Sequence, residues 1–318
     1  LREVKAPAGY LLPEGDTAFT VSHYGEQVIA PVYNEKIEVS FEKADFAGEE
    51  VAGAECELLV MSTNGWKKVD SWVSSIGGPH KIDGVLEAGK EYLYKEAAAP
   101  DGYAYSASIR FTIGSDGKVA HARYVDDSGK SLVYGSDGRP TDVTFTESLA
   151  GDTYQRGGEE LSLVDGNLVD NAGKTVVEGA AVALPIEDNV VVMKDDVVVV
   201  SFEKADFAGQ EIDGADCTLS EKKADGTTEQ IDRWVSEVGG PHVMSHGLKV
   251  ETTYIYHEEL AAPGYGYSYD IEFMVDKAGK AVNAHYLDLN GNKVLYDRAG
   301  FPTGIIALDN GTYRDGSI

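Results

Sequence analysis

What the sequence lacks most is positive charge. The 318 residues include 27 lysines and arginines against 54 aspartates and glutamates, for a net charge of −27. Nucleic acids and anionic membrane surfaces are bound through clustered lysine and arginine, so neither is expected as a partner. The acidic excess suits a soluble protein exposed to solvent. No apolar run approaches a membrane span, so no membrane insertion is expected, and no signal peptide or basic targeting segment is visible.

Cysteine is nearly absent, and the two that are present, Cys56 and Cys217, lie 161 positions apart. Both stand in a Gly-Ala-x-Cys-x-Leu context and so occupy one position in two copies of a repeated sequence. Equivalent positions in separate domains rarely meet, so a disulfide between them is not expected. Two buried thiols that fill core positions are favoured over redox or metal chemistry. An extracellular protein without disulfides would need another kind of covalent crosslink for stability.

The sequence also lacks a long amphipathic helix and any nucleophile–base–acid arrangement typical of an enzyme. Short alternating runs separated by Gly, Asn and Asp turn signals fill the chain instead. Strands are expected at 39–43, 92–94, 109–113 and 271–275, and the 36 glycines suit a turn-rich fold. The pattern predicts an all-β protein built from β-sandwiches.

The chain repeats itself over more than a hundred residues. Residues 39–54 read VSFEKADFAGEEVAGA and residues 200–215 read VSFEKADFAGQEIDGA. A repeat of this length is a whole domain rather than a solenoid unit. Tandem copies of one domain usually serve as spacers or multivalent displays. We expect residues 1–36 to end a preceding copy, residues 37–196 to form a complete copy, and residues 197–318 to form a second copy without its last strands.

In both copies a lysine falls on the apolar face of a strand. Alternation in VSFEK places Val39, Phe41 and Lys43 on one side of the strand. Lys204 has the same placement in the second copy. Because lysine is seldom buried without a partner, its recurrence at this position requires a chemical reason.

A glutamate recurs on a second strand. Residues 92–103 read YLYKEAAAPDGY and residues 254–265 read YIYHEELAAPGY, which places Glu96 and Glu258 on the face of the tyrosines. The last copy is one residue shorter before its Gly-Tyr, so Glu259 stays an alternative to Glu258. The chain opens with the same unit, which puts Glu3 in that position.

An Asn or Asp precedes each lysine strand. Asn34 lies nine residues before Lys43, and Asp195 lies nine residues before Lys204. Asp196 and Asn189 are alternatives for the same role. Asp195 is preferred over them only because of its position relative to the lysine strand.

A lysine, a glutamate and an Asn or Asp on inner strand faces can form a covalent bond. An amine buried away from water has a lowered pKa and becomes a nucleophile. A buried carboxyl has a raised pKa and can pass protons. Attack of the amine on the Asn or Asp carbonyl releases ammonia or water and leaves an isopeptide bond, formed once by proximity. No cofactor is required, and none is expected.

These residues resemble the collagen-adhesin B-type, prealbumin-like repeat domains of Gram-positive pilins and surface adhesins. The lysine strand with its EKAD continuation and the Y-x-E-x-x-A-P-x-G-Y box make the resemblance. It implies tandem immunoglobulin-like or prealbumin-like β-sandwiches in which Lys43 bonds Asp195 and Glu96 assists. The partial sets in the other copies are Glu3 with Asn34, and Lys204 with Glu258. The resemblance also implies an extracellular, cell-surface location, with cell-wall attachment through regions outside this chain.

The sequence therefore predicts a structural stalk segment of an adhesin or pilus-like protein that crosslinks itself once and is not an enzyme. Its expected partners are other domains of the same surface protein or fibre. The alternative is a ligand-binding adhesin module that uses the hairpins expected in residues 120–170 and 286–303. No host ligand can be identified from the sequence. His242 and His246 have a possible metal spacing, but the first copy has Gly84 where the second has His246, so no metal site is expected.

Overall fold

The computed structural model describes residues 1–20, 31–308 and 310–315, and within these ranges it contains strands but no helix. Accordingly, the described chain has no helix with the length and apolar character needed to cross a membrane. The all-β expectation is confirmed. Contacts divide the chain into two units, Leu1–Ala99 with Ser106–Asp195, and Pro100–Tyr105 with Asp196–Ile318. Part of the expected first copy, residues 21–30, lies outside the described residues.

The first unit is a β-sandwich with a hairpin extension. Its strands are β1 (Glu38–Asp45), β2 (Glu55–Ser62), β3 (Gly65–Val73), β4 (His80–Asp83), β5 (Glu91–Ala98), β6 (Ser108–Ile113), β7 (Val119–Val125), β8 (Ser131–Tyr134), β9 (Pro140–Thr146), β10 (Thr153–Arg156), β11 (Glu159–Val164), β12 (Asn167–Val169), β13 (Thr175–Val177) and β14 (Val190–Asp195). One sheet has the order β14-β1-β4, and the other runs β13-β12-β11-β10-β9-β8-β7-β6-β5-β2-β3.

The main core of this unit lies between the two sheets. Val39 and Phe41 of β1 are buried, and they belong to one apolar cluster with side chains of β2, β5 and β6. The ring of Phe41 meets Tyr94 of β5 edge to face, with centroids 5.2 Å apart. This is the inward face that the alternation in VSFEK predicts.

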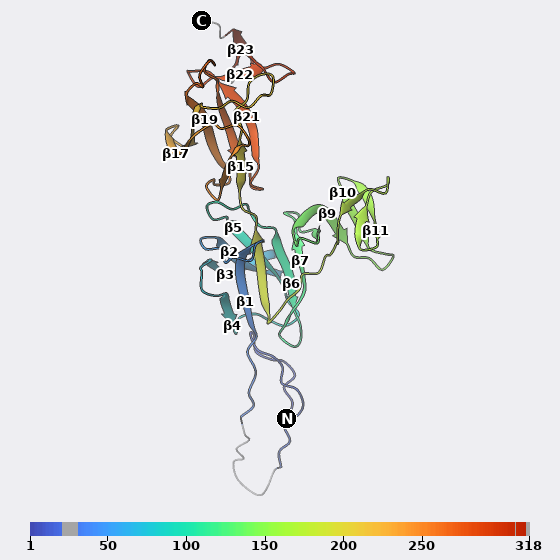
Figure 1. The fold of residues 1–318 in the computed structure, drawn as a ribbon. Coiled ribbons are helices and arrows are strands. Elements are labelled where there is room, and N and C mark those ends of the chain that lie inside the picture. The colour runs from blue at the N-terminus through green and yellow to red at the C-terminus, as the bar shows by residue number, and fades with distance from the viewer. Residues whose placement is uncertain (21–30, 309, 316–318) are drawn as a thin grey trace. The chain divides into compact units, whose positions relative to one another are not determined.

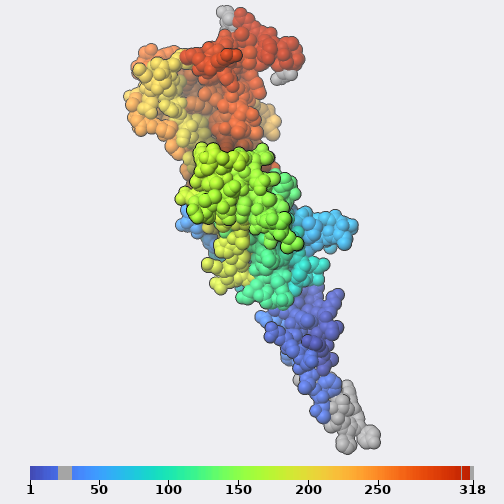
Figure 2. All heavy atoms as spheres, turned by 90° about the vertical axis from the view of Figure 1, so that its right-hand side faces the viewer, coloured from blue at the N-terminus to red at the C-terminus, as the bar shows by residue number. Residues whose placement is uncertain are grey.

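Strands β8–β13 form the hairpins expected in the complete copy. They enclose a second, smaller core of their own, made of Val133, Val143, Phe145, Leu161, Leu168 and Val177. In the space-filling view these hairpins, coloured yellow-green, form one continuous block of atoms (Figure 2). The extension is therefore a packed element with apolar side chains inside it.

The second unit repeats the strand order of the first. Its strands are β15 (Val199–Phe202), β16 (Asp216–Lys222), β17 (Thr228–Val235), β18 (His242–Ser245), β19 (Thr252–Leu260), β20 (Asp270–Val275), β21 (Ala281–Leu287), β22 (Lys293–Tyr296), β23 (Pro302–Ala307) and β24 (Tyr313–Asp315). The order β17-β16-β19-β20-β21-β22-β23-β24 matches β3-β2-β5-β6-β7-β8-β9-β10. Within the described residues β15 pairs with β18, as β1 pairs with β4.

The first and last strands of the first unit lie side by side. Strands β1 and β14 pair in parallel, with Ser40 opposite Val190 and Asp45 opposite Asp195. Figure 1 shows β14, in yellow, beside the blue β1. This pairing brings together residues about 150 positions apart in the sequence. It creates the site described below.

The two cysteines are buried thiols, as expected. Cys56 lies opposite Glu96 in the β2–β5 pairing, with its Sγ 3.5 Å from the Tyr94 hydroxyl. Burial raises the pKa of the Cys56 thiol to about 11. A thiol that stays protonated and inaccessible is unreactive, which fits a packing role.

Candidate crosslinking site

Three ionisable side chains meet in the core of the first unit. Lys43 from β1 lies with its Nζ 3.0 Å from Glu96 Oε1 of β5, and it also contacts Asp195 Oδ1 at the end of β14. The side chains of Lys43, Glu96 and Asp195 are 1%, 0% and 0% exposed. Strand alternation explains each placement, because each of the three residues lies two positions from a buried residue on the same face of its own strand.

A serine outside the strands, Ser106, completes the site. Ser106 Oγ accepts a hydrogen bond from Lys43 Nζ at 2.6 Å and also contacts Asp195 Oδ1. The Ser106 amide donates to Glu96 Oε2 at 2.8 Å. A sequence signal exists, because Tyr-Ala-Tyr-Ser ends at Ser106 and Tyr-Gly-Tyr-Ser ends at Ser268, each ten residues after the box glutamate.

The electrostatics favour a protonated Glu96. Burial raises the pKa of the Glu96 carboxyl to about 7, an effect that Lys43 opposes and Asp195 reinforces. One ammonium faces two carboxyls here, so a proton on Glu96 makes the buried cluster neutral. A neutral cluster avoids the large cost of burying an uncompensated charge.

The side chain of Asn189, one alternative to Asp195, contacts backbone groups. Its Nδ2 donates to Glu38 O at 2.6 Å and its Oδ1 accepts from Val119 N at 2.7 Å. The backbone carbonyl of Asp196 accepts a hydrogen bond from Ala104 within the second unit. Asp195 contacts Lys43 directly.

The second unit has the same arrangement around Lys204. Lys204 Nζ lies 3.0 Å from Glu258 Oε1 and donates to Ser268 Oγ at 3.0 Å, while the Ser268 amide donates to Glu258 Oε2 at 2.7 Å. The neighbouring Glu259 is exposed, so Glu258 occupies the position of Glu96. The Lys204 side chain is 12% exposed.

Glu3 and Asn34 also meet. Asn34 Nδ2 donates to Glu3 Oε2 at 2.7 Å and to Leu11 O at 3.0 Å. Both residues are partly buried. The glutamate and the acceptor of the first partial set are thus neighbours, at positions that correspond to Glu96 and Asp195.

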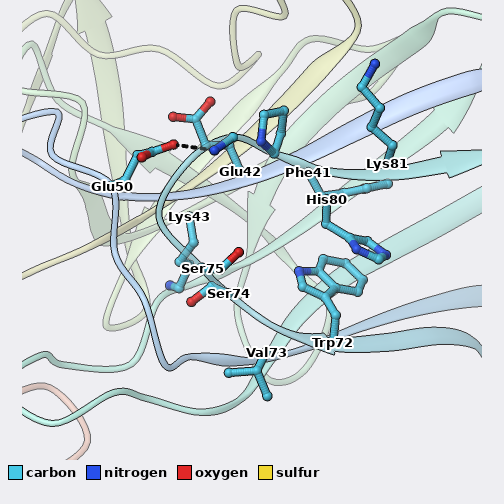
Figure 3. A pocket seen from close by; sticks show the side chains of 12 residues that line it. Phe41, Glu42, Lys43, Glu50, Trp72, Val73, Ser74, Ser75, His80 and Lys81 are labelled. Atoms are coloured by element: carbon cyan, nitrogen blue, oxygen red, sulfur yellow. Dashed lines mark hydrogen bonds between the residues drawn. The ribbon is translucent and has the colours of Figure 1, made fainter.

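A cavity of about 290 Å³ opens beside Lys43. In Figure 3 the rings of Trp72 and His80 lie face to face on one wall, with centroids 4.2 Å apart, and Glu50 lies on another. Glu50 holds the Gly77–Gly78 turn by accepting both backbone N–H groups. Lys204 lines a related cavity of about 450 Å³ in the second unit. The lysine is therefore close to a space that can hold water.

The recurring histidines have structural contacts. His80 Nε2 lies 2.8 Å from Asp70 Oδ2, and His242 Nε2 lies 2.7 Å from Asp232 Oδ2. Each ring stacks on the tryptophan of its own repeat. Across the described residues no group of three or more His, Cys, Asp or Glu side chains is placed to bind a metal ion.

The strand order and the buried site define a β-sandwich of the prealbumin-like type. Residues 37–128 match the family described as SpaA, prealbumin-like fold domain, so the resemblance to prealbumin-like domains is confirmed for this segment. No curated protein sequence matches the chain.

Several solved structures are similar to the chain at low identity. The pilus adhesin SpaC of Lactobacillus rhamnosus GG, in its open conformation, is 17% identical, with a TM-score of 0.34 over 83% of this chain and 30% of that one. A C-terminal fragment of the same adhesin is 17% identical, with a TM-score of 0.37 over 87% and 95%. The shaft pilin SpaA of that organism is 13% identical, with a TM-score of 0.27 over 76% and 93%. The chain spans about 30% of the length of the whole adhesin.

Proposed function

We propose that this chain is a structural stalk segment of a Gram-positive cell-surface adhesin or pilus-like protein, stabilised by an isopeptide bond between Lys43 and Asp195. The main support is the buried contact of these two side chains beside Glu96, at the junction of the first and last strands of one unit. The match of residues 37–128 to the family described as SpaA, prealbumin-like fold domain, also supports the proposal.

The bond forms by condensation within the cluster. The Lys43 ammonium gives a proton to the Asp195 carboxylate, and the neutral amine attacks the Asp195 Cγ. Protonated Glu96 stabilises the developing oxyanion and gives its proton to the departing hydroxyl, and it then takes the extra proton from the attacking nitrogen, so that Glu96 ends protonated. The Nζ–Cγ bond forms, one C–O bond breaks, and one water leaves, with the adjacent cavity as its route out. The proton count of the cluster does not change until the water departs.

The position of the bond suits a segment under tension. Force along the chain enters the unit at the start of β1 and leaves it at the end of β14. These neighbouring strands are parallel, so the force shears their hydrogen bonds. A covalent link from Lys43 to Asp195 diverts the force past the 152 positions between them. The rest of the sandwich then bears no load.

The intact mass of the purified chain tests this proposal. We expect the parent to weigh one water less than its sequence, and Glu96→Gln to have the full mass of its sequence. Glu258→Gln is the matched control, because it changes the same carboxyl in the other repeat, and it should still lose one water. A parent of full sequence mass would contradict the proposal.

A further inference from the structure

The Y-x-E-x-x-A-P-x-G-Y motif, which contains the glutamate proposed to assist, ends in a loop. In two of its three copies this loop is hydrogen-bonded to the residues that lead into the first strand of the following repeat. In the first unit the Leu11 amide donates to Glu35 O at 2.7 Å, and the Ile37 amide donates to Gly9 O at 2.9 Å. These bonds flank an antiparallel bridge between Tyr10 and Lys36. The loop therefore adds a short strand to the residues that lead into β1.

The second unit has the same contacts at the equivalent positions. The Ala104 amide donates to Asp196 O at 2.8 Å, and the Val198 amide donates to Gly102 O at 2.8 Å. They flank a bridge between Tyr103 and Val197. Consistent with this, residues Pro100–Tyr105 group with the second unit although they follow β5 of the first.

A glycine makes the close approach possible in both places. Gly9 has a φ of +85°, and a Cβ there would lie 1.9 Å from the carbonyl oxygen of Gly84. Gly102 has a φ of +89°, and its Cβ would lie 2.5 Å from the carbonyl oxygen of His246. Both the left-handed backbone and the contact exclude a side chain. Substitution of either glycine would push the loop away from its partner.

The third copy of this loop has the same shape but an open face. The Tyr265 amide donates to Ala262 O at 3.0 Å, the same turn that Tyr10 and Tyr103 make with Pro7 and Pro100. Gly264 has a φ of +87°, yet no described heavy atom lies within 4 Å of its Cβ position. Tyr265 is 47% exposed and Tyr267 is 67% exposed.

We infer that Pro263–Gly266 is a docking loop for the start of the first strand of another domain of this type. The occupant is a second copy of the surface formed by Glu35–Ile37 and Gly84. Recognition is through backbone hydrogen bonds, which explains why the occupied loops tolerate Lys36 in one junction and Val197 in the other. The exposed tyrosines supply apolar area at the edge of the contact. The inference does not depend on the isopeptide bond.

Disulfide trapping between full-length chains tests this inference. One chain has Tyr265→Cys, and the other has Lys36→Cys together with Gly9→Val, which releases its own loop from the docking surface. Tyr10 and Lys36 face each other as a non-hydrogen-bonded antiparallel pair, with the hydrogen bonds made by the residues on either side. The Cα atoms of such a pair are about 4.5 Å apart, which is within reach of a disulfide. The natural cysteines are buried and do not compete. The pair Tyr103→Cys with Val197→Cys is the positive control and should close within one chain.

We expect Tyr265→Cys to couple at least about tenfold faster than Leu289→Cys, a fully exposed control in the same unit. Adding Gly264→Val should remove the advantage. Lys36→Cys without the Gly9 change should show the same preference more slowly, because its own loop must open first. The Lys36→Cys chain that keeps Gly9 therefore still tests the inference if Gly9→Val disturbs folding. Equal coupling of Tyr265→Cys and Leu289→Cys with both partners would overturn the inference, as would faster coupling of Tyr265→Cys to itself.

Discussion

Replacement of Glu96 by glutamine should convert a unit that cannot be extended by force into one that can. The substitution keeps the shape of the side chain but removes the acid that the condensation needs, so Lys43 and Asp195 should stay unlinked. In the parent, the proposed bond would hold the 152 positions between these residues in a closed loop. A fully extended chain spans about 3.5 Å per residue, so the loop conceals about 500 Å of length.

Single-molecule pulling on the two chain ends measures this length directly. Traces of Glu96→Gln should contain one additional unfolding step of about 500 Å that is absent from the parent. The second unit unfolds in every variant and so provides an internal standard. Glu258→Gln controls for the loss of one buried carboxyl and should give parent-like traces. If the parent releases the same length as Glu96→Gln, the first unit is not closed by a covalent bond.

Four further outcomes are expected. In calorimetry, Glu96→Gln should lower the Tm of the first unit by about 10–20 °C, because a closed loop of this size is worth about 5 kcal/mol, whereas Glu258→Gln should lower the Tm of the second unit by much less; equal shifts would argue against a bond. The rate of bond formation, followed by mass during refolding of unreacted chain, should fall as the pH rises through about 7, since Glu96 loses its proton there; a rate that increases over this range would contradict an acid role. Ser106→Ala should slow the reaction without preventing it, and Ser268→Ala should leave the rate unchanged in the same assay. Asp195→Asn should still react, but with loss of ammonia instead of water, and an unreacted Asn variant would count against attack at this side chain.

Much of the site follows from strand alternation. Two-residue periodicity places Lys43 among Val39 and Phe41, and it places Glu96 among buried tyrosines, so the inward direction of both can be predicted. The duplication strengthens each assignment, because Lys204 and Glu258 repeat the pattern independently. Periodicity fails where the chain leaves its strands.

Ser106 illustrates this limit, since it lies in an irregular segment between β5 and β6 where no period assigns a face. The junction between repeats is also hard to predict, because backbone hydrogen bonds leave little trace in side-chain identity. Gly9 and Gly102 are the residues in the sequence that mark this junction, because each must leave room for a neighbouring carbonyl group. The parallel pairing of β1 with β14 depends on closing a long loop, which local sequence does not encode.

The most direct test of the proposed bond is tandem mass spectrometry of a protease digest of the parent chain. The account predicts a branched peptide in which the Nζ of Lys43 is joined to the Cγ of Asp195, with the mass of its two arms less one water. Recovery of Lys43 and Asp195 only in separate, unmodified peptides would contradict it.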